Sequence, residues 1–180
     1  VSIGEVAGES ARAVGKPVVM VSEHGKDVDA ASVTVYNASA IHEAVDHLVE
    51  HGHTRIGFLG FDGHSDIRER YEAYREAMVA HGLEPYDRIC ASGDVEESQH
   101  DAAAVAAADP AWTAIIAGTD RNAWGLIAGL RELGIHVPRD LAVIGFDDLE
   151  SSWRHDPPLT TARQDFTELG VAAGRLILAE

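Results

Sequence analysis

The stretch Leu141-Ala-Val-Ile-Gly-Phe146, followed by Asp147 and Asp148, decides the fold class of this chain. An apolar run without polar alternation is typical of a parallel strand that is buried on both faces. Asp147 falls where this strand ends, and ligands of open α/β sheets bind beyond the carboxyl ends of the strands. A carboxylate there can accept hydrogen bonds from two hydroxyls of a neutral polyol. The alternative for such an aspartate is a helix N-cap or a turn.

On the N-terminal side of this stretch, short apolar runs typical of strands alternate with segments whose apolar residues recur at helical spacing. Strands or extended segments are expected over residues 16–22, 32–36, 55–60, 88–91, 113–117, 141–146 and 159–164. Helices are expected over residues 5–14, 37–52, 66–81, 96–108 and 120–133, and from residue 166 onward. Strands that alternate with helices of this length require parallel βαβ units, so the predicted fold class is α/β.

Composition and charge narrow the classes of function. The chain has 180 residues, enough for one large or two small domains, and its 14 basic and 30 acidic residues give a net charge of −16. This charge repels phosphate backbones, so the segment itself is not expected to bind nucleic acid. The single cysteine, Cys90, excludes an internal disulfide. No apolar run is long enough to cross a membrane, and the first residues lack a signal-peptide pattern.

Motifs for catalysis or metal binding are weak. His47 and His51 lie one helical turn apart, but Leu48 stands where a metalloprotease motif needs glutamate, so solvated histidines on a helix face are favoured. The glycines of residues 60–63 are too few for a phosphate loop, and Cys90 lies inside an apolar strand pattern. Asp147 and Asp148 have no neighbouring residues that would complete a catalytic set. We therefore expect no enzyme activity, no metal and no cofactor.

Five motifs follow one another in the order and spacing of a known family. Together they resemble the LacI/GalR sugar-responsive transcriptional regulators and cover residues 45–60, 70–78, 118–125, 137–148 and 157–166. The resemblance implies a periplasmic-binding-protein-like fold, in which crossover segments join two α/β lobes around a ligand cleft. It divides the chain into the end of the N-terminal lobe (1–52), the C-terminal lobe (53–158) and a return to the first lobe (159–180). A DNA-binding helix-turn-helix and the first strands of that lobe would precede Val1.

The resemblance also implies which residues contact the effector, namely Arg70, Asp147, Asp66, His64, Thr119, Gln164 and Phe166. A guanidinium fork that reaches from a helix start can donate to two ring hydroxyls at once. The alternative for Arg70 is a surface arginine paired with an acid four residues later, but that position holds Tyr74. Phe166 either stacks on the apolar face of a sugar or belongs to the core.

Some positions depart from the family pattern and leave the identity of the effector open. Val95 stands where relatives often place an aromatic residue, and Thr119 stands where asparagine is usual. Tyr36 and Asn37 replace the more usual Asp-Asn pair.

The resulting interpretation is a cytoplasmic effector-sensing domain that binds a carbohydrate or sugar derivative, forms a homodimer, and reaches DNA only through a separate head. A periplasmic sugar-binding protein and a sensor module of another signalling protein are the alternatives, and an enzyme is the third.

Overall fold

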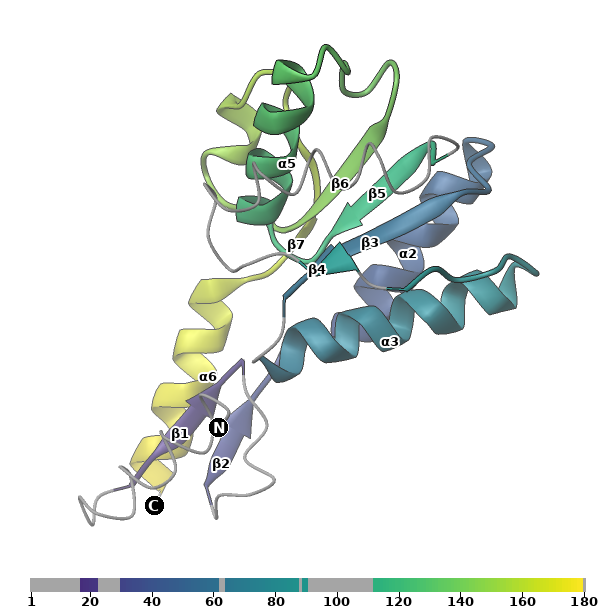
Figure 1. Ribbon diagram of the computed structural model, residues 1–180. Helices are drawn as coiled ribbons and strands as arrows, with labels where there is room; N and C mark the ends of the chain where they lie inside the picture. The colour runs from purple at the N-terminus through teal and green to yellow at the C-terminus, as the bar shows by residue number, and fades with distance from the viewer. Residues whose placement is uncertain (1–16, 23–29, 62–63, 88, 91–111, 180) are drawn as a thin grey trace.

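The computed structural model describes residues 17–22, 30–61, 64–87, 89–90 and 112–179. Within these residues the chain forms two parallel sheets (Figure 1). The small sheet pairs β1 (Val19–Val21) with β2 (Ala31–Val33). The large sheet has the order β4-β3-β5-β6-β7, with β3 (Ile56–Gly60), β4 (Ile89–Cys90), β5 (Ala114–Ala117), β6 (Ala142–Asp147) and β7 (Thr160–Arg163). The α/β prediction, with a buried parallel strand before Asp147, is confirmed.

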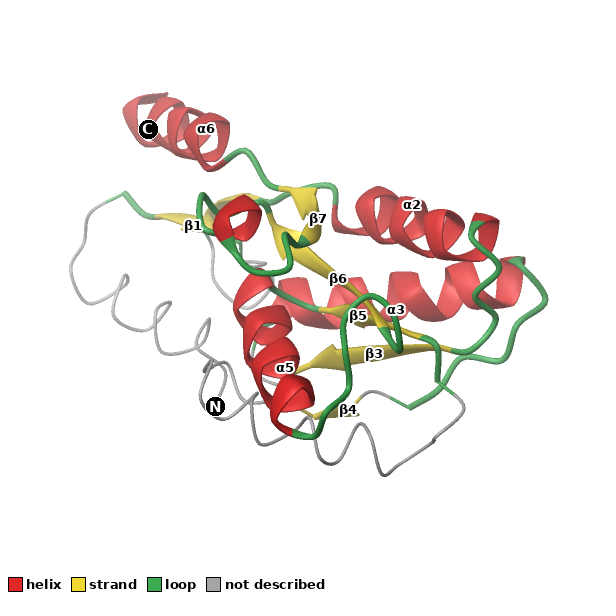
Figure 2. Cartoon of the chain, turned by 90° about the horizontal axis from the view of Figure 1, so that it is seen from above, coloured by secondary structure: helices red, strands yellow, loops and turns green. Residues whose placement is uncertain are grey.

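Helices cover both faces of the large sheet. Helices α2 (Asn37–Glu50) and α3 (Ser65–Ala80) lie side by side on one face, and α5 (Asp120–Glu132) lies on the other (Figure 2). Helix α6 (Phe166–Ala179) extends away from the large sheet and packs beside β1 and β2 (Figure 1). The loop after β6 contains a 3-10 turn, η1 (Ser152–Arg154), that the sequence pattern did not predict. The helices predicted over 5–14 and 96–108 lie outside the described residues.

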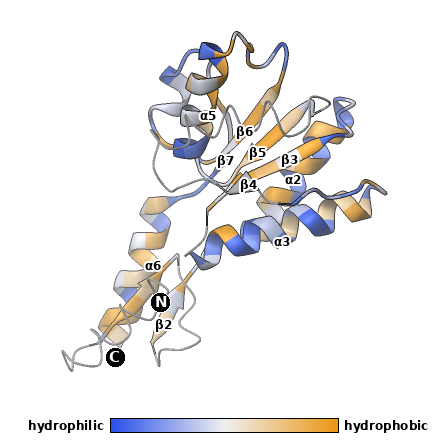
Figure 3. Ribbon diagram, viewed as in Figure 1, coloured by the Kyte–Doolittle hydropathy of each residue, from blue (hydrophilic) through white to orange (hydrophobic). Residues whose placement is uncertain are grey.

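Alternation along the strands divides the apolar side chains between two cores. Phe58 packs against the α2 and α3 face, together with Ile41 and Tyr74. Its neighbour Leu59 points to the opposite face and packs with Leu126 under α5, because successive strand residues face opposite ways. In Figure 3 strands β3 and β5 at the centre of the sheet are hydrophobic, whereas α3 carries many hydrophilic residues.

Packing places α2 with the large sheet. Its buried residues, among them Val45 and Leu48, share a core with Ile56 of β3 and Met78 of α3. The sequence prediction placed the end of the N-terminal lobe at residue 52. By packing, the chain joins the large sheet already at Asn37, where α2 begins. Likewise β7 completes the large sheet before the chain leaves through α6. Among the described helices, none is long and apolar enough to span a membrane.

Candidate ligand-binding site

Arg70 stands at the centre of a buried polar cluster beyond the carboxyl ends of the strands. Its side chain, on the second turn of α3, is almost fully buried and donates three hydrogen bonds. Nε donates to Asn37 Oδ1 at 2.8 Å, Nη1 to the Gly118 carbonyl at 2.7 Å and Nη2 to Gln164 Oε1 at 3.3 Å. The rigid fork of the guanidinium thus joins the start of α2, the end of β5 and the segment after β7.

The buried carboxylate of Asp66 and the partly buried carboxylate of Asp147 face the same guanidinium. Asp66 Oδ2 lies 3.7 Å from Nη2, and Asp147 Oδ1 lies 3.8 Å from Nη1. The Phe146 ring covers one face of the cation, at 3.6 Å from its centre. Burial lowers the pKa of Arg70, while the charges of Asp147 and Asp66 oppose that effect. An arginine has such a high intrinsic pKa that the group stays a cation.

Asp147 has an environment that brings its titration close to neutrality. The pKa of Asp147 is raised to about 7, chiefly by burial and also by the charges of Asp120 and Asp66, while the charge of Arg70 and a backbone hydrogen bond from Asp120 oppose the rise. Its backbone is also unusual, with φ of 132°, and the next residue, Asp148, has φ of 53°. Both values lie in a region that residues other than glycine rarely adopt, so the surrounding structure must hold this turn in place.

The Arg70 cluster lies where the chain passes between the two sheets. Asn37 begins α2 directly after the segment that leaves β2, and Gln164 lies between β7 and α6. Gln164 Nε2 in turn reaches Ser22 Oγ, just after β1, at 3.5 Å. Arg70 therefore contacts both described connections between the sheets, through Asn37 after β2 and through Gln164 after β7.

The structure brings together four of the seven predicted residues: Arg70, Asp66, Asp147 and Gln164. Thr119 follows Gly118 and caps α5, accepting a hydrogen bond from the Asn122 N–H at 3.1 Å. His64 precedes α3 and packs edge-on against Phe61. Phe166 begins α6 with its side chain 51% exposed, so the alternative that placed it in the core is wrong.

Sequence reasoning missed Asn37 and Asp120 as members of the site. Asn37 is buried, accepts from Arg70 and donates to Glu69 Oε2 at 2.9 Å. Asp120 is fully buried behind the turn that carries Asp147. Asp120 lies in the motif of residues 118–125, and Asn37 belongs to the Tyr36-Asn37 pair that departs from the family pattern. A polar residue at a helix start is more often a cap, so their residue type alone did not mark them as site residues.

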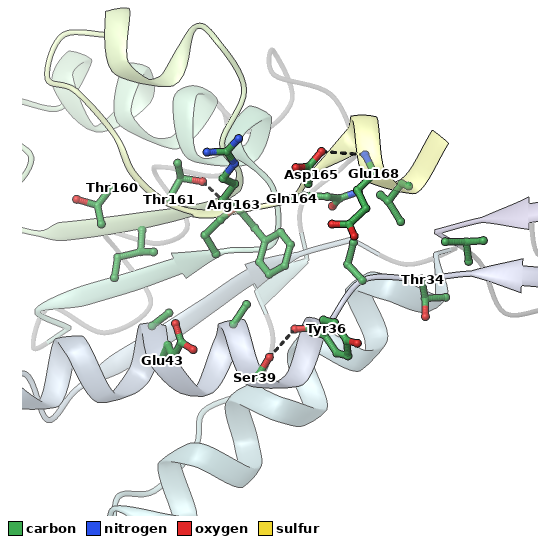
Figure 4. Close-up of a pocket in the computed structure, with 18 of the residues that line it drawn as sticks. Thr34, Tyr36, Ser39, Glu43, Thr160, Thr161, Arg163, Gln164, Asp165 and Glu168 are labelled. Atoms are coloured by element: carbon green, nitrogen blue, oxygen red, sulfur yellow. Dashed lines mark hydrogen bonds between the residues drawn. The ribbon is translucent and has the colours of Figure 1, made fainter. Parts of the chain in front are cut away.

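A groove of about 770 Å³ runs along α2, the outer edge of β7 and the start of α6 (Figure 4). Apolar residues such as Ala44, Ile144 and Leu169 line it, with Glu43 and Glu168 among its polar residues. Of the predicted site residues only Gln164 lines this groove, which also meets the Arg70 cluster at Phe146.

The chemistry of the Arg70 cluster suits binding. A fixed cation and a carboxylate that face each other across 3.8 Å offer donors and an acceptor to a hydroxylated molecule. In the part of the chain that the structure describes, no group of three or more histidine, cysteine or acidic residues could hold a metal ion.

Comparison with known proteins agrees with this geometry. Residues 45–180 match the model of the periplasmic binding protein-like domain family. The chain belongs to this family. It is similar to the HTH-type transcriptional regulator MalR of Streptomyces coelicolor, with 34% identity over 96% of this chain and 52% of that protein. The resemblance to LacI/GalR regulators is therefore confirmed.

Solved structures support the same assignment. A regulatory protein of the LacI family from Chloroflexus aggregans shares 29% identity and a TM-score of 0.82, over 95% of this chain and 63% of that one. A LacI family regulator from Enterococcus faecium, solved with bound ribose, shares the fold at 23% identity and a TM-score of 0.83, over 97% and 65% of the two chains. The chain spans about half the length of the curated relatives that it matches.

Proposed function

We propose that this effector-binding domain senses a sugar or sugar derivative through the Arg70 cluster and controls DNA binding by a separate head. The observation that carries the proposal is the buried Arg70 fork, which faces Asp147 and binds Asn37 and Gln164 between the two sheets. A neutral polyol can bind both groups without bringing a charge of its own.

Ligand at this site would act on the connections between the sheets. Ligand hydroxyls that accept from the N–H groups now donated to Asn37 and Gln164 would compete with these two side chains for Arg70. A ligand shifts a conformational equilibrium only through different contacts in the two states, and this competition supplies such a difference. The relative orientation of the lobes, and with it a distant DNA-binding head, would then depend on the ligand.

The wider context of the proposal comes from the relatives. Relatives such as MalR are named as transcriptional regulators, which supports a binding role without turnover. We propose a cytoplasmic homodimer that reaches DNA through a helix-turn-helix outside these residues. The net charge of −16 is consistent with leaving DNA contact to another domain.

A thermal-shift screen tests the proposal with D-ribose, maltose, nucleosides and sugar phosphates as probes. A probe that binds the folded state raises the melting temperature by mass action. We expect Arg70→Ala and Asp147→Ala to abolish that shift. Arg68→Ala is the matched control, because Arg68 lies on the same helix with an exposed side chain. A shift that persists in both site variants would place the ligand elsewhere and reject the proposal.

A further inference from the structure

The carboxylate of Asp120 is fully buried at the start of α5 and accepts three hydrogen bonds. Oδ2 accepts from the Leu149 backbone N–H at 2.9 Å and from Ser152 Oγ at 2.5 Å. Oδ1 accepts from Thr161 Oγ1 at 2.5 Å. The three donors belong to the loop after β6, to η1 and to β7, so this one side chain joins three segments that follow it in the sequence.

The hydroxyl of Thr161 extends this network by one more bond. It accepts from the Asp148 backbone N–H at 3.3 Å while it donates to Asp120. Asp120 therefore holds two consecutive N–H groups after Asp147, that of Leu149 directly and that of Asp148 through Thr161. These bonds fix the turn in which Asp147 and Asp148 both have positive φ.

We propose that Asp120 is a positioning residue for ligand binding, which holds the turn after β6 so that the Asp147 carboxylate faces Arg70. This inference rests on the proposed function of the Arg70 cluster. Asp120 acts through Asp147, because its own side chain is 0% exposed and both of its oxygens accept bonds from the protein. The space for it depends on Gly145, where a Cβ atom would collide with the Asp120 carboxylate.

If Asp120 positions Asp147, and does not merely stabilise the fold, disturbing its hydrogen bonds must change the pKa of Asp147. The charge of Asp120 raises the pKa of Asp147, as does that of Asp66, while Arg70 lowers it. Any change in how the turn presents Asp147 to Arg70 must therefore change the titration of Asp147. A change that only weakens packing elsewhere leaves that titration as it is.

The variant Thr161→Val tests the inference, because valine keeps the β-branched shape and removes the hydroxyl. Thr160→Val on the same strand is the matched control, since Thr160 is exposed. We expect Thr161→Val to speed exchange of the Asp148 amide hydrogen and weaken D-ribose binding by about tenfold each, the loss of one hydrogen bond. In a carbon-13 NMR titration, the pKa of the Asp147 carboxyl should move in Thr161→Val and stay in Thr160→Val. Thr161→Ser should restore all three properties.

Asp120→Asn provides an independent measurement. Loss of the negative charge should lower the pKa of Asp147, in the direction that removal of a like charge dictates. If Asp120→Asn does not fold, the Thr161 variants still decide the question. The inference is overturned if Thr161→Val lowers the melting temperature but leaves the Asp147 titration and the Asp148 exchange equal to those of Thr160→Val.

Failure of the proposed function gives a different result. The unaltered protein would then bind neither D-ribose nor the other probes, while the titration and exchange of the variants still changed as expected. Asp120 would still set the position of Asp147, and the sugar-sensing role of the Arg70 cluster would be rejected.

Discussion

The guanidinium of Arg70 lies 3.6 Å from the centre of the Phe146 ring, and both side chains are buried. A ring face attracts a cation, by about 2 kcal/mol or more where water is excluded. Because the ring covers one face of the cation, Arg70 meets its hydrogen-bond partners through its edge. The strand that ends at Asp147 thus supplies both the wall behind Arg70 and a carboxylate at its edge.

Arg70→Lys tests whether the planar shape of the guanidinium stabilises the protein in addition to its positive charge. A lysine ammonium cannot reach Asn37, the Gly118 carbonyl and Gln164 in the planar geometry that the guanidinium provides. Buried acceptors left without donors cost about 1–3 kcal/mol, so the free energy of unfolding should fall by about that amount in a urea titration. Arg68→Lys on the exposed side of α3 should stay within about 0.5 kcal/mol of the parent protein. Equal stability of the two variants would contradict the bonds described for Arg70.

The raised pKa of Asp147 predicts a pH-dependent stability. Because the folded state holds the Asp147 proton up to about pH 7, the contribution of this group is fully present below its unfolded pKa near 3.8. It is lost as the pH rises through 7. Between pH 5 and pH 8 the loss amounts to about 3 kcal/mol at most. Asp147→Asn should not show this loss. Its free energy of unfolding should therefore increase relative to that of the parent protein as the pH rises from 5 to 8.

Urea titrations of both proteins at several pH values check this expectation. Asp148→Asn, one residue further along, is the control and should retain the pH dependence of the parent protein. A constant difference between Asp147→Asn and the parent protein from pH 5 to pH 8 would show that the folded-state pKa of Asp147 lies below about 5 and not near 7.

Gly145→Ala should destabilise the fold through a collision. A Cβ atom at residue 145 would overlap the Asp120 carboxylate and would lie 2.8 Å from Leu159 Cδ2. Overpacking of this kind costs about 1–3 kcal/mol, which a urea titration measures. Gly170→Ala is the control, because nothing lies within 4 Å of its Cβ position on α6. Alanine should stabilise that helix by about 0.5–1 kcal/mol, and a loss at both positions would argue against the described packing around Asp120.

Tyr74 is expected to stabilise the core through its hydroxyl as well as its ring. The hydroxyl donates to the Ile56 carbonyl at 2.8 Å and accepts from the Tyr86 N–H at 3.0 Å, and burial raises the pKa of Tyr74 to about 12. Tyr74→Phe leaves both backbone groups without this partner and should lower the unfolding free energy by about 1–3 kcal/mol. Tyr71→Phe, whose longer bond of 3.4 Å to the Tyr86 carbonyl is only partly buried, should lose less.

Much of the fold could be predicted because its signals are local. Helices α2, α3 and α5 are each followed two residues later by a glycine, and Gly52, Gly82 and Gly134 have the positive φ that such a helix end requires. The run from Leu141 to Phe146 covers all of strand β6 but its last residue, and the apolar patterns before it contain β3 and β5. These features depend on side-chain periodicity and backbone preference within a few residues, which the sequence displays directly.

The candidate site was predictable only in part. Its motif residues Arg70, Asp66, Asp147 and Gln164 do meet, whereas Thr119 caps a helix and Phe166 is half exposed. A residue type at a motif position does not say which way its side chain turns. The Thr119 hydroxyl turns toward α5, because it caps the free N–H groups at the start of that helix.

By itself the sequence determined the alternation of strands and helices, the parallel sheet and the family, because periodicity and motif spacing are properties of the chain. Only the tertiary structure decided that Arg70 binds Gln164, 94 positions away, and that Asp120 binds Thr161, 41 positions away. The physical reason is burial. A carboxylate or guanidinium removed from water must find partners wherever the packed elements bring them, and those partners are set by the arrangement of the sheets and not by nearness in sequence.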